Sequence, residues 1–346
     1  MPKDAADPAH QKKNLSREQR ELKVRFERIL TGVRKLVADQ ANYRRVAAAN
    51  STNSKPWYPL AYFTNANGEL DTHRSSIAVN KTTYYEYQID VARYESINEF
   101  IERLLYDEIL ESYTGRMPPN WFFQSYLSKA FNDGINDTIQ DIKNQSTPSL
   151  VGDIVSRQIQ SLSSDEFNPQ ATQSLALVYG RVFNEMKGLT DSMKVDLSET
   201  LTRGMADGLG IRAISADVQK RVGVGFSRAQ RIARTEILGA YRTAQRAKTK
   251  EINETVFDDS PYEFKQLWFS ALAESSRPWH VSKHGGIYTQ QEVEKFYSEN
   301  GNSIQCLCSQ SPILVYRKTG KAVIDDTIKR MEAQKKAYQM ARGIAA

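Results

Sequence analysis

Four side chains that could bind a metal ion or take part in catalysis lie close together in the last quarter of this 346-residue sequence. His280 and His284 stand in the stretch SSRPWHVSKHGG, and Cys306 and Cys308, the only cysteines, follow in SIQCLC. Two histidines and two cysteines are a familiar ligand set for tetrahedral zinc, and histidines four residues apart share one face of a helix. The spacing therefore favours zinc if this stretch is helical.

Other features of the same stretch argue against zinc. A single residue separates the two cysteines, which is unusual for a structural zinc site, and Gly285 and Gly286 favour a turn directly after His284. Alternate residues of a strand point to the same side, so both thiols could simply line one core. Cysteines this close also make a poor disulfide, which is typical of a reducing compartment.

A catalytic site is the second interpretation. Arg277 and Glu236 could form an electrostatic clamp around an acid–base histidine, His280, as a small metal-free nuclease requires. The sequence supplies no clear nucleophile or phosphate-binding loop for such a reaction.

A structural role is the third interpretation, and the sequence favours it. Glu236 interrupts a face of small residues on a predicted helix, formed by Ala229, Ala233, Ala240 and Ala244. A buried carboxylate needs a cation, so we expect Glu236 to pair with Arg277 while His280 bonds within the following turn. Breaking such a buried pair typically costs about 3–5 kcal/mol. We call the predicted cluster the polar lock; it consists of Arg234, Glu236, Glu274, Arg277 and His280.

The elements that must position these residues are mostly helical. Apolar side chains at spacings of three and four predict helices at 15–47, 97–113, 120–142, 172–210, 211–223 and 227–250. Gly208 and Gly210 are expected to end the fourth of these and Gly223 the fifth. The stretches 145–149 and 161–170 are expected to be linkers. Asn67-Gly68 predicts a tight turn of the kind found in hairpins, and residues 82–90 have strand composition without an evident partner strand.

The composition changes after Pro261. Strands are predicted at 262–270 and 311–317, with a short helix at 289–301 between them. The sequence therefore predicts an α+β protein with mainly helical N-terminal and middle regions, a small α+β C-terminal domain and a basic C-terminal helix. The predicted segments are a basic arm at 1–50, an aromatic-rich segment at 51–95, a helical region at 96–225, the α+β domain at 226–317 and a basic tail at 318–346.

Four features of residues 185–317, in this order, resemble the Mu F-like head-morphogenesis minor capsid proteins of tailed bacteriophages. The first is the helix–glycine–short helix unit LTDSMKVDLSETLTRGMADGLGIRAISADVQKRVG, and the second is the helix RAQRIARTEILGAYRTAQ. The third is a tryptophan strand followed by an acidic residue, R-P-x-H and glycine, at Trp268, Glu274, Arg277, Pro278, His280 and Gly286. The last is C-x-C before the final strand.

The sequence departs from the family pattern at two positions. Glu274 stands where aspartate is usual, and Leu307 replaces the arginine between the cysteines. Some relatives carry C-x-x-C in place of R-P-x-H, which would supply four thiolates for zinc. This chain does not, so a zinc site does not carry over from them, and no cofactor is implied.

The resemblance implies a structural protein of the virion and not an enzyme. It implies a minor head protein, present in few copies, that is recruited during procapsid assembly in the host bacterial cytoplasm near the portal vertex. Expected partners are the portal protein and the major capsid or scaffolding protein, and in some phages the packaged double-stranded DNA. The family's α+β domain also resembles some small ribonuclease toxins, so a metal-independent nuclease-like effector remains the alternative, beside a non-catalytic DNA-binding protein.

Charge is unevenly distributed along the chain. Residues 1–50 carry twelve Lys and Arg against six Asp and Glu, and residues 316–346 carry eight against three. Basic ends suit phosphate or an acidic protein surface, although solvated helices would look the same. No apolar run is long enough for a membrane span, and the N-terminus has no signal-peptide pattern. The predicted partner-contacting residues are Lys318, Lys321, Lys329, Arg330, Lys335, Lys336 and Arg342.

Overall fold

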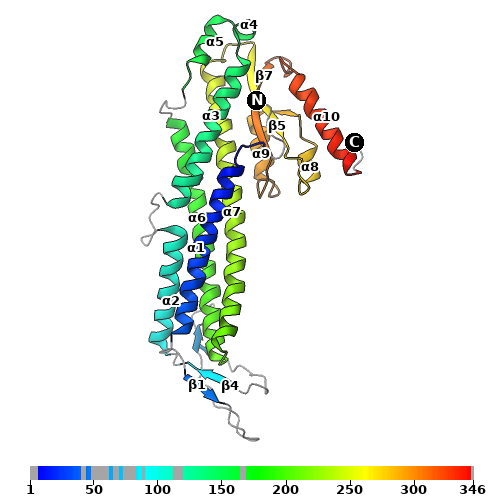
Figure 1. The fold of residues 1–346 in the computed structure, drawn as a ribbon. Coiled ribbons are helices and arrows are strands. Elements are labelled where there is room, and N and C mark those ends of the chain that lie inside the picture. The colour runs from blue at the N-terminus through cyan, green and yellow to red at the C-terminus, as the bar shows by residue number, and fades with distance from the viewer. Residues whose placement is uncertain are drawn as a thin grey trace. The chain divides into compact units, whose positions relative to one another are not determined.

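The computed structural model describes residues 7–39, 44–47, 62–64, 70–72, 83–87, 90–111, 120–163 and 169–343. It is mainly helical, with a three-stranded antiparallel sheet near the C-terminus, which confirms the predicted α+β class (Figure 1). Among these residues no helix is both long and apolar enough to cross a membrane. The chain divides into two compact units, each assembled from separate stretches.

One unit comprises residues 20–120 and 183–230. It contains most of α1 (Lys12–Ala38), then α2 (Val91–Leu105) with the π-helical turn η2 (Tyr106–Leu110), and parts of α6 (Pro169–Ala206) and α7 (Ile211–Thr255). The apolar stripe predicted for the first helix is buried, with Leu22, Phe26, Ile29, Val33 and Val37 at most 3% exposed. The apolar periodicity of the first helix therefore predicted correctly which of its side chains are buried.

The first helix is shorter than predicted. It ends at Ala38, and Arg44–Ala47 form β1, which pairs antiparallel with β4 (Thr83–Glu86). The helical stripe stops at Val37, so nothing holds the following residues in a helix, and they supply the partner strand that the sequence did not reveal. A second pair, β2 (Tyr62–Thr64) and β3 (Leu70–Thr72), is antiparallel as a hairpin around Asn67-Gly68 requires, although that turn lies outside the described residues.

The two helices predicted at 211–223 and 227–250 are one continuous helix, α7. Neither Gly223 nor Gly225 adopts a positive φ, so neither acts as a stop. A Cβ at Gly225 would lie 2.6 Å from Met193 Sδ, which makes this glycine a packing residue. Gly208, with φ of 60°, follows the end of α6 as predicted.

The other unit comprises residues 1–19, 121–182 and 231–346 and holds the sheet. The central strand β5 (Tyr262–Phe269) pairs antiparallel with β6 (Ile287–Tyr288) and with β7 (Ser309–Tyr316). Short α8 (Pro278–Val281), α9 (Gln290–Ser298) and α10 (Asp326–Ala341) lie beside the sheet (Figure 1). Both predicted strands and the predicted short helix are present, and a capping box of Thr289 and Glu292 starts that helix.

Several helices of this unit pack on one face of the sheet. They are α3 (Ser128–Gln145), which follows the π-helical turn η3 (Phe123–Leu127), α4 (Pro148–Val151) and α5 (Asp153–Gln160), with the end of α7. Phe264 and Leu314 of the sheet form a buried cluster with Ile142, Ile159 and Ile252. On the other face, Leu267, Ile313 and Val315 pack against Met331 of α10. The sheet is therefore covered on both faces.

Two amide side chains complete the hydrogen bonding of the sheet. Asn253 accepts from the backbone N–H of Phe264 and donates to its carbonyl, both at 2.8 Å. Gln145 accepts from the N–H of Leu314 at 3.0 Å and donates to the carbonyl of Pro312 at 2.8 Å. These side chains take the place of strand neighbours, because buried backbone groups must be paired.

Candidate functional site: a buried histidine–cysteine cluster

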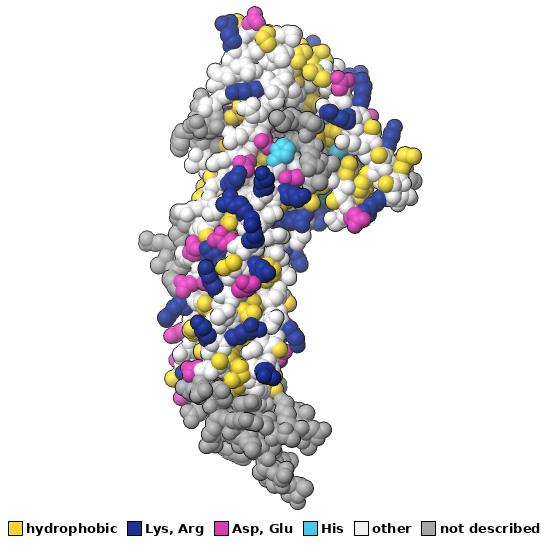
Figure 2. Space-filling model, viewed as in Figure 1, with side chains coloured by type: hydrophobic (Ala, Val, Ile, Leu, Met, Phe, Trp, Pro, Cys, Tyr) yellow, Lys and Arg dark blue, Asp and Glu magenta, His cyan; other side chains and the backbone are white. Residues whose placement is uncertain are grey.

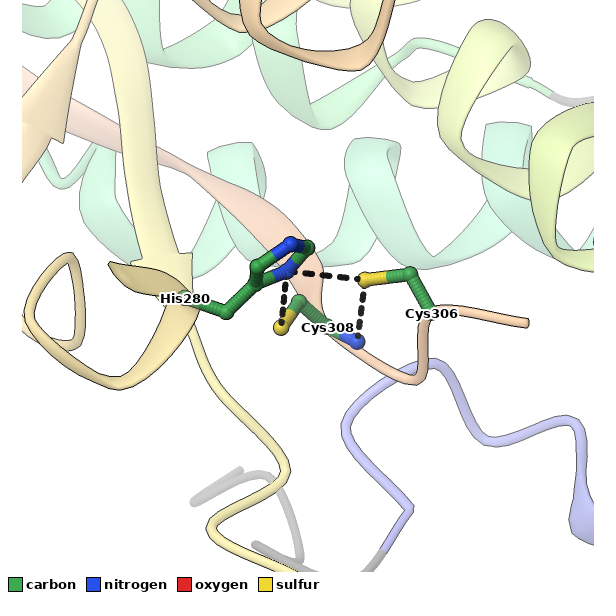
Figure 3. A group of neighbouring side chains, drawn as sticks. All are labelled: His280, Cys306 and Cys308. Atoms are coloured by element: carbon green, nitrogen blue, oxygen red, sulfur yellow. Dashed lines mark hydrogen bonds between the residues drawn. The ribbon is translucent and has the colours of Figure 1, made fainter. Parts of the chain in front are cut away.

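Three of the four predicted ligand side chains lie together. His280 Nδ1 is 3.3 Å from Cys306 Sγ and 3.6 Å from Cys308 Sγ (Figure 3). The three ligand atoms all lie within 4.8 Å of one another. His280, Cys306 and Cys308 are 2%, 6% and 3% exposed. We call them the His–Cys cluster.

The cluster is positioned by α8 and by the loop before β7. Pro278 occupies the first turn of α8, where its fixed φ suits a helix start, and His280 follows within that turn. Arg277, the N-cap residue, donates to the carbonyls of Asn302 at 3.2 Å and Ile304 at 3.0 Å. It thereby ties α8 to the loop that carries the cysteines. Gln305, with φ of 52°, turns the chain directly before Cys306.

Asn302 orients the imidazole of His280. Its amide nitrogen donates to the Phe296 carbonyl at 2.9 Å, which turns its Oδ1 toward His280 Nε2, 3.4 Å away. Arg277 Nη1 is also 3.4 Å from Nε2, but this guanidinium already donates to backbone carbonyls. A ring proton on Nε2 would leave the lone pair of Nδ1 facing the two sulfur atoms, whereas a proton on Nδ1 would be donated toward them.

The pKa values of the two thiols are shifted in opposite directions. The hydrogen bond from Cys308, helped by the Arg242 charge and by His280 against the cost of desolvation, lowers the pKa of Cys306 to about 3. The same hydrogen bond and then burial raise the pKa of Cys308 well above its ordinary value. Both shifts favour the negative charge on Cys306 over Cys308.

A buried arginine supports this negative charge. Arg242 of α7 is 2% exposed; it donates to the Cys308 carbonyl at 2.9 Å and to the Cys306 carbonyl, and lies 4.6 Å from the Tyr297 ring centre. Burial by itself would lower the pKa of Arg242, but Tyr297 and the two cysteines raise it. The aromatic wall is completed by Trp268, which stacks on Tyr297 at 5.2 Å and meets Phe296 edge-on at 5.0 Å.

His284 does not join the cluster, so the predicted four-ligand set is wrong for the cluster as folded. Its Nδ1 accepts from the Ser270 N–H at 3.0 Å, and its Nε2 lies 3.4 Å from Gln334 Oε1. Since α8 ends at Val281, the two histidines do not share a helical face. Desolvation by burial lowers the pKa of His284, which disfavours its charged form.

The pairing expected at the centre of the polar lock is also wrong. Glu236 Oε2 accepts from Arg181 of α6, at 3.2 Å from Nε and 2.5 Å from Nη2. Arg277 instead donates hydrogen bonds to backbone carbonyls of the loop at 301–304. The small-residue face does carry a buried carboxylate, as predicted, but its cation comes from a helix that the sequence did not connect with it.

The outer members of the predicted lock lie apart from Glu236. Glu274 pairs with Arg342 at 3.2 Å, and its side chain is 95% exposed. Arg234 is half-buried, its Nε has no hydrogen-bond partner among the described residues, and desolvation lowers its pKa. The sequence also missed Arg181, Arg242 and Asn302. Arg242 stands in the quoted family helix, and Asn302 follows the expected end of a helix at Gly301, but nothing in the local sequence indicated their partners.

Three of the seven predicted partner-contacting residues bond to a carboxylate or a backbone carbonyl of their own unit. Arg342 pairs with Glu274, and Lys335 donates to the Ser282 carbonyl at 3.4 Å. Lys329 pairs with Asp325 one helical turn away. The other four, Lys318, Lys321, Arg330 and Lys336, are exposed.

The fold and cluster define a small α+β module, built on the end of a long helix and centred on buried polar groups. Residues 195–311, about a third of the chain, match the family described as Phage Mu protein F like protein. The segment thus has the predicted relationship, and it contains all three residues of the His–Cys cluster. No curated protein and no solved structure matches the chain.

Proposed function

We propose that the protein is a minor head protein that acts structurally during procapsid and head assembly near the portal vertex of a tailed bacteriophage. The observation that carries the proposal is the Mu F-like match over residues 195–311, a family with a role in head morphogenesis. The site of action in the head, the low copy number and presence in the mature virion belong to the proposal.

The buried site supports a structural role. The proposed catalytic group would need Glu236, Arg277 and His280 around one substrate, whereas Glu236 and Arg277 bond to different partners. Cys306, His280 and Asn302 lie in the arrangement of a cysteine-hydrolase triad, with the imidazole between the thiol and the amide. All three residues are, however, at most 6% exposed. A substrate could not reach the Cys306 sulfur without opening the core. The three side chains therefore stabilise the fold of the protein.

The partners belong to the proposal as well. We expect the portal protein and the major capsid or scaffolding protein to be the direct contacts, with packaged double-stranded DNA as a further contact of the basic tail. On the face seen in Figure 2, Lys and Arg side chains are intermixed with Asp and Glu side chains along the helices. Such mixing suits protein contacts, whereas the exposed lysines of the C-terminal segment suit phosphate.

Mass spectrometry of purified virions tests the proposal. We expect peptides of this chain at a low, fixed ratio to the portal protein, and defective heads when its gene carries a nonsense mutation. Normal heads and complete absence from procapsids as well as virions would contradict the proposal.

A nuclease assay tests the enzymatic alternative. Purified protein is incubated with RNA and DNA, with and without EDTA, beside the variant His280→Ala. We expect no cleavage by either protein. Cleavage by the wild type that the variant loses would replace the structural proposal by the enzymatic one.

A further inference from the structure

The donor atoms of the His–Cys cluster have the spacing of a metal site. With Zn–N of about 2.0–2.1 Å and Zn–S of about 2.3 Å, tetrahedral coordination places nitrogen and sulfur about 3.6 Å apart. The distances from His280 Nδ1 to the two sulfur atoms are 3.3 and 3.6 Å. Both distances are close to that spacing, and the two sulfur atoms lie within 4.8 Å of each other.

The residues around His280, Cys306 and Cys308 orient these three side chains as the neighbours of metal ligands commonly do. A ligating histidine usually donates its other N–H to an oxygen, and here His280 Nε2 faces Asn302 Oδ1. The backbone on either side of Leu307 is fixed by Arg242, which donates to the carbonyls of Cys306 and Cys308. All three lone pairs thus converge on one buried point (Figure 3).

We propose that His280, Cys306 and Cys308 bind one Zn²⁺ ion, which locks the loop before β7 to α8. Thiolate and imidazole ligands suit zinc, whereas magnesium and calcium prefer oxygen. On binding, the ion forms two Zn–S bonds and one Zn–N bond, and the proton left on the thiol pair passes to solvent. The inference goes beyond the proposed function, because a head protein could fold with or without metal.

Three protein ligands leave a fourth position in a tetrahedral site. The Ser270 hydroxyl lies 3.8 Å from Cys308 Sγ, and it or a water molecule would complete the coordination. Two thiolates balance the charge of the ion, and the two carbonyls and the Tyr297 ring still stabilise the Arg242 guanidinium beside the site. Because the three ligand residues are at most 6% exposed, the fourth position is closed to substrates.

A metal-free thiolate–imidazole pair is the competing account of the same geometry. In that case Cys306 stays a thiolate beside Arg242, Cys308 keeps its proton, and no ion enters. The two accounts differ in metal content and in thiol reactivity, so one set of measurements separates them.

The experiment uses the full-length protein. It is stripped with a chelator, dialysed, and titrated with Zn²⁺ or with Co²⁺ as a spectroscopic probe. We expect one bound metal per chain by elemental analysis, a sulfur-to-cobalt charge-transfer band, and alkylation of the cysteines at least tenfold slower with zinc than without. Less than a tenth of an equivalent of zinc, no cobalt band and zinc-independent alkylation would overturn the proposal.

Variants locate the site. Cys306→Ser and Cys308→Ser should each abolish the cobalt band, and Asn302→Ala should weaken zinc binding about 10–100-fold as loss of a positioning residue. His284→Asn is the matched control, a buried histidine outside the cluster, and should keep the band. A band retained in both cysteine variants, or lost only in the control, would place the metal elsewhere and overturn the assignment. If a variant does not fold, stoichiometry and the cobalt spectrum of the wild type still decide.

Discussion

Arg242 shows how much a single side chain contributes to this module. Its guanidinium is 2% exposed and is held by two backbone carbonyls and a tyrosine ring, without a carboxylate among its described partners. An uncompensated buried charge is costly, so the thiolate of Cys306 is part of what makes this arginine tolerable. Arginine and the His–Cys cluster are therefore one electrostatic unit.

The ion pair of Glu236 and Arg181 should respond asymmetrically to substitution. The Glu236 side chain is 10% exposed and that of Arg181 is 55% exposed, so removing the arginine takes a cation away from the more buried of the two charges. We expect Arg181→Ala to lower the free energy of unfolding by about 1–2 kcal/mol and Glu236→Gln by less than about 1 kcal/mol. Urea unfolding of both variants and of the double variant measures this, and a larger effect of Glu236→Gln would contradict it.

His284 should make stability depend on pH. Its pKa in the folded protein lies below the unfolded value of 6.5, because burial disfavours the charged ring. As the pH falls, His284 is protonated in the unfolded state before it is protonated in the folded state. The contribution of neutral His284 to the free energy of unfolding is therefore complete above pH 6.5 and decreases as the pH falls through that value. Urea unfolding between pH 5 and pH 8 measures the slope, and His284→Asn should flatten it. An unchanged slope in that variant would show that another group is responsible.

At the scale of elements, close approach between helices matters most. The small-residue face of α7 allows the backbone of α3 to approach closely at Gly134. A Cβ at Gly134 would lie 2.4 Å from the Tyr241 carbonyl oxygen and 3.0 Å from Ala244 Cβ. The glycine therefore serves packing, since a helix interior otherwise disfavours it.

Gly134→Ala tests this contact. The added methyl group must separate α3 from α7, so we expect a loss of about 1–3 kcal/mol in the free energy of unfolding. Gly188→Ala in α6 is the matched control, because a Cβ there would meet nothing within 4 Å, and it should stabilise by about 0.5–1 kcal/mol. Thermal and urea unfolding of both variants decide, and equal effects would contradict the packing argument.

Asn253 offers a second test at this scale. Replacing it by alanine leaves the N–H and carbonyl of Phe264 without their partner inside the core. We expect a loss of about 1–3 kcal/mol and faster hydrogen exchange at the Phe264 amide. Asn253→Asp keeps the acceptor and should protect that amide better than alanine does; equal exchange in the two variants would show that the bond is unimportant.

At the scale of the whole molecule, charge and division into units bear on function. The two compact units are each assembled from separate stretches, and α1, α6 and α7 each contribute to both. Four exposed basic residues of the C-terminal segment remain available for a partner, while Met331 of the same segment packs into the sheet unit. Deleting the segment would thus damage the core as well as remove charge.

Charge substitution avoids that damage. We expect the combined change of Lys318, Lys321, Arg330 and Lys336 to glutamine to weaken double-stranded DNA binding and to reduce its salt slope by up to about 3–4. The matched control changes the three lysines to arginine, which keeps the charge, and should bind as the wild type does. Binding measured by anisotropy over a range of salt concentrations checks this. An unchanged slope in the glutamine variant would exclude the tail as a DNA contact.

Features that depend on neighbouring residues could be predicted from the sequence, whereas contacts between distant residues could not. The stripe on α1, the small-residue face of α7, the two long strands and the short helix α9 all follow from local periodicity, and the structure confirms them. The continuity of α7 through Gly223 and Gly225 did not follow, because a glycine stops a helix only where its backbone leaves the helical region. The pairing of β1 with β4 did not follow either, since a strand partner more than thirty residues away leaves no local signal.

The sequence by itself determined the class of the fold, the buried carboxylate of Glu236 and the relationship of residues 195–311 to the Mu F-like family. Only the tertiary structure decided that Arg181 pairs with Glu236, that His280 but not His284 meets the two cysteines, and that Arg242 lies beneath them. The physical reason is that periodicity depends on neighbours along the chain. The partner of a buried charge or donor is instead set by which elements pack within a few ångströms of it.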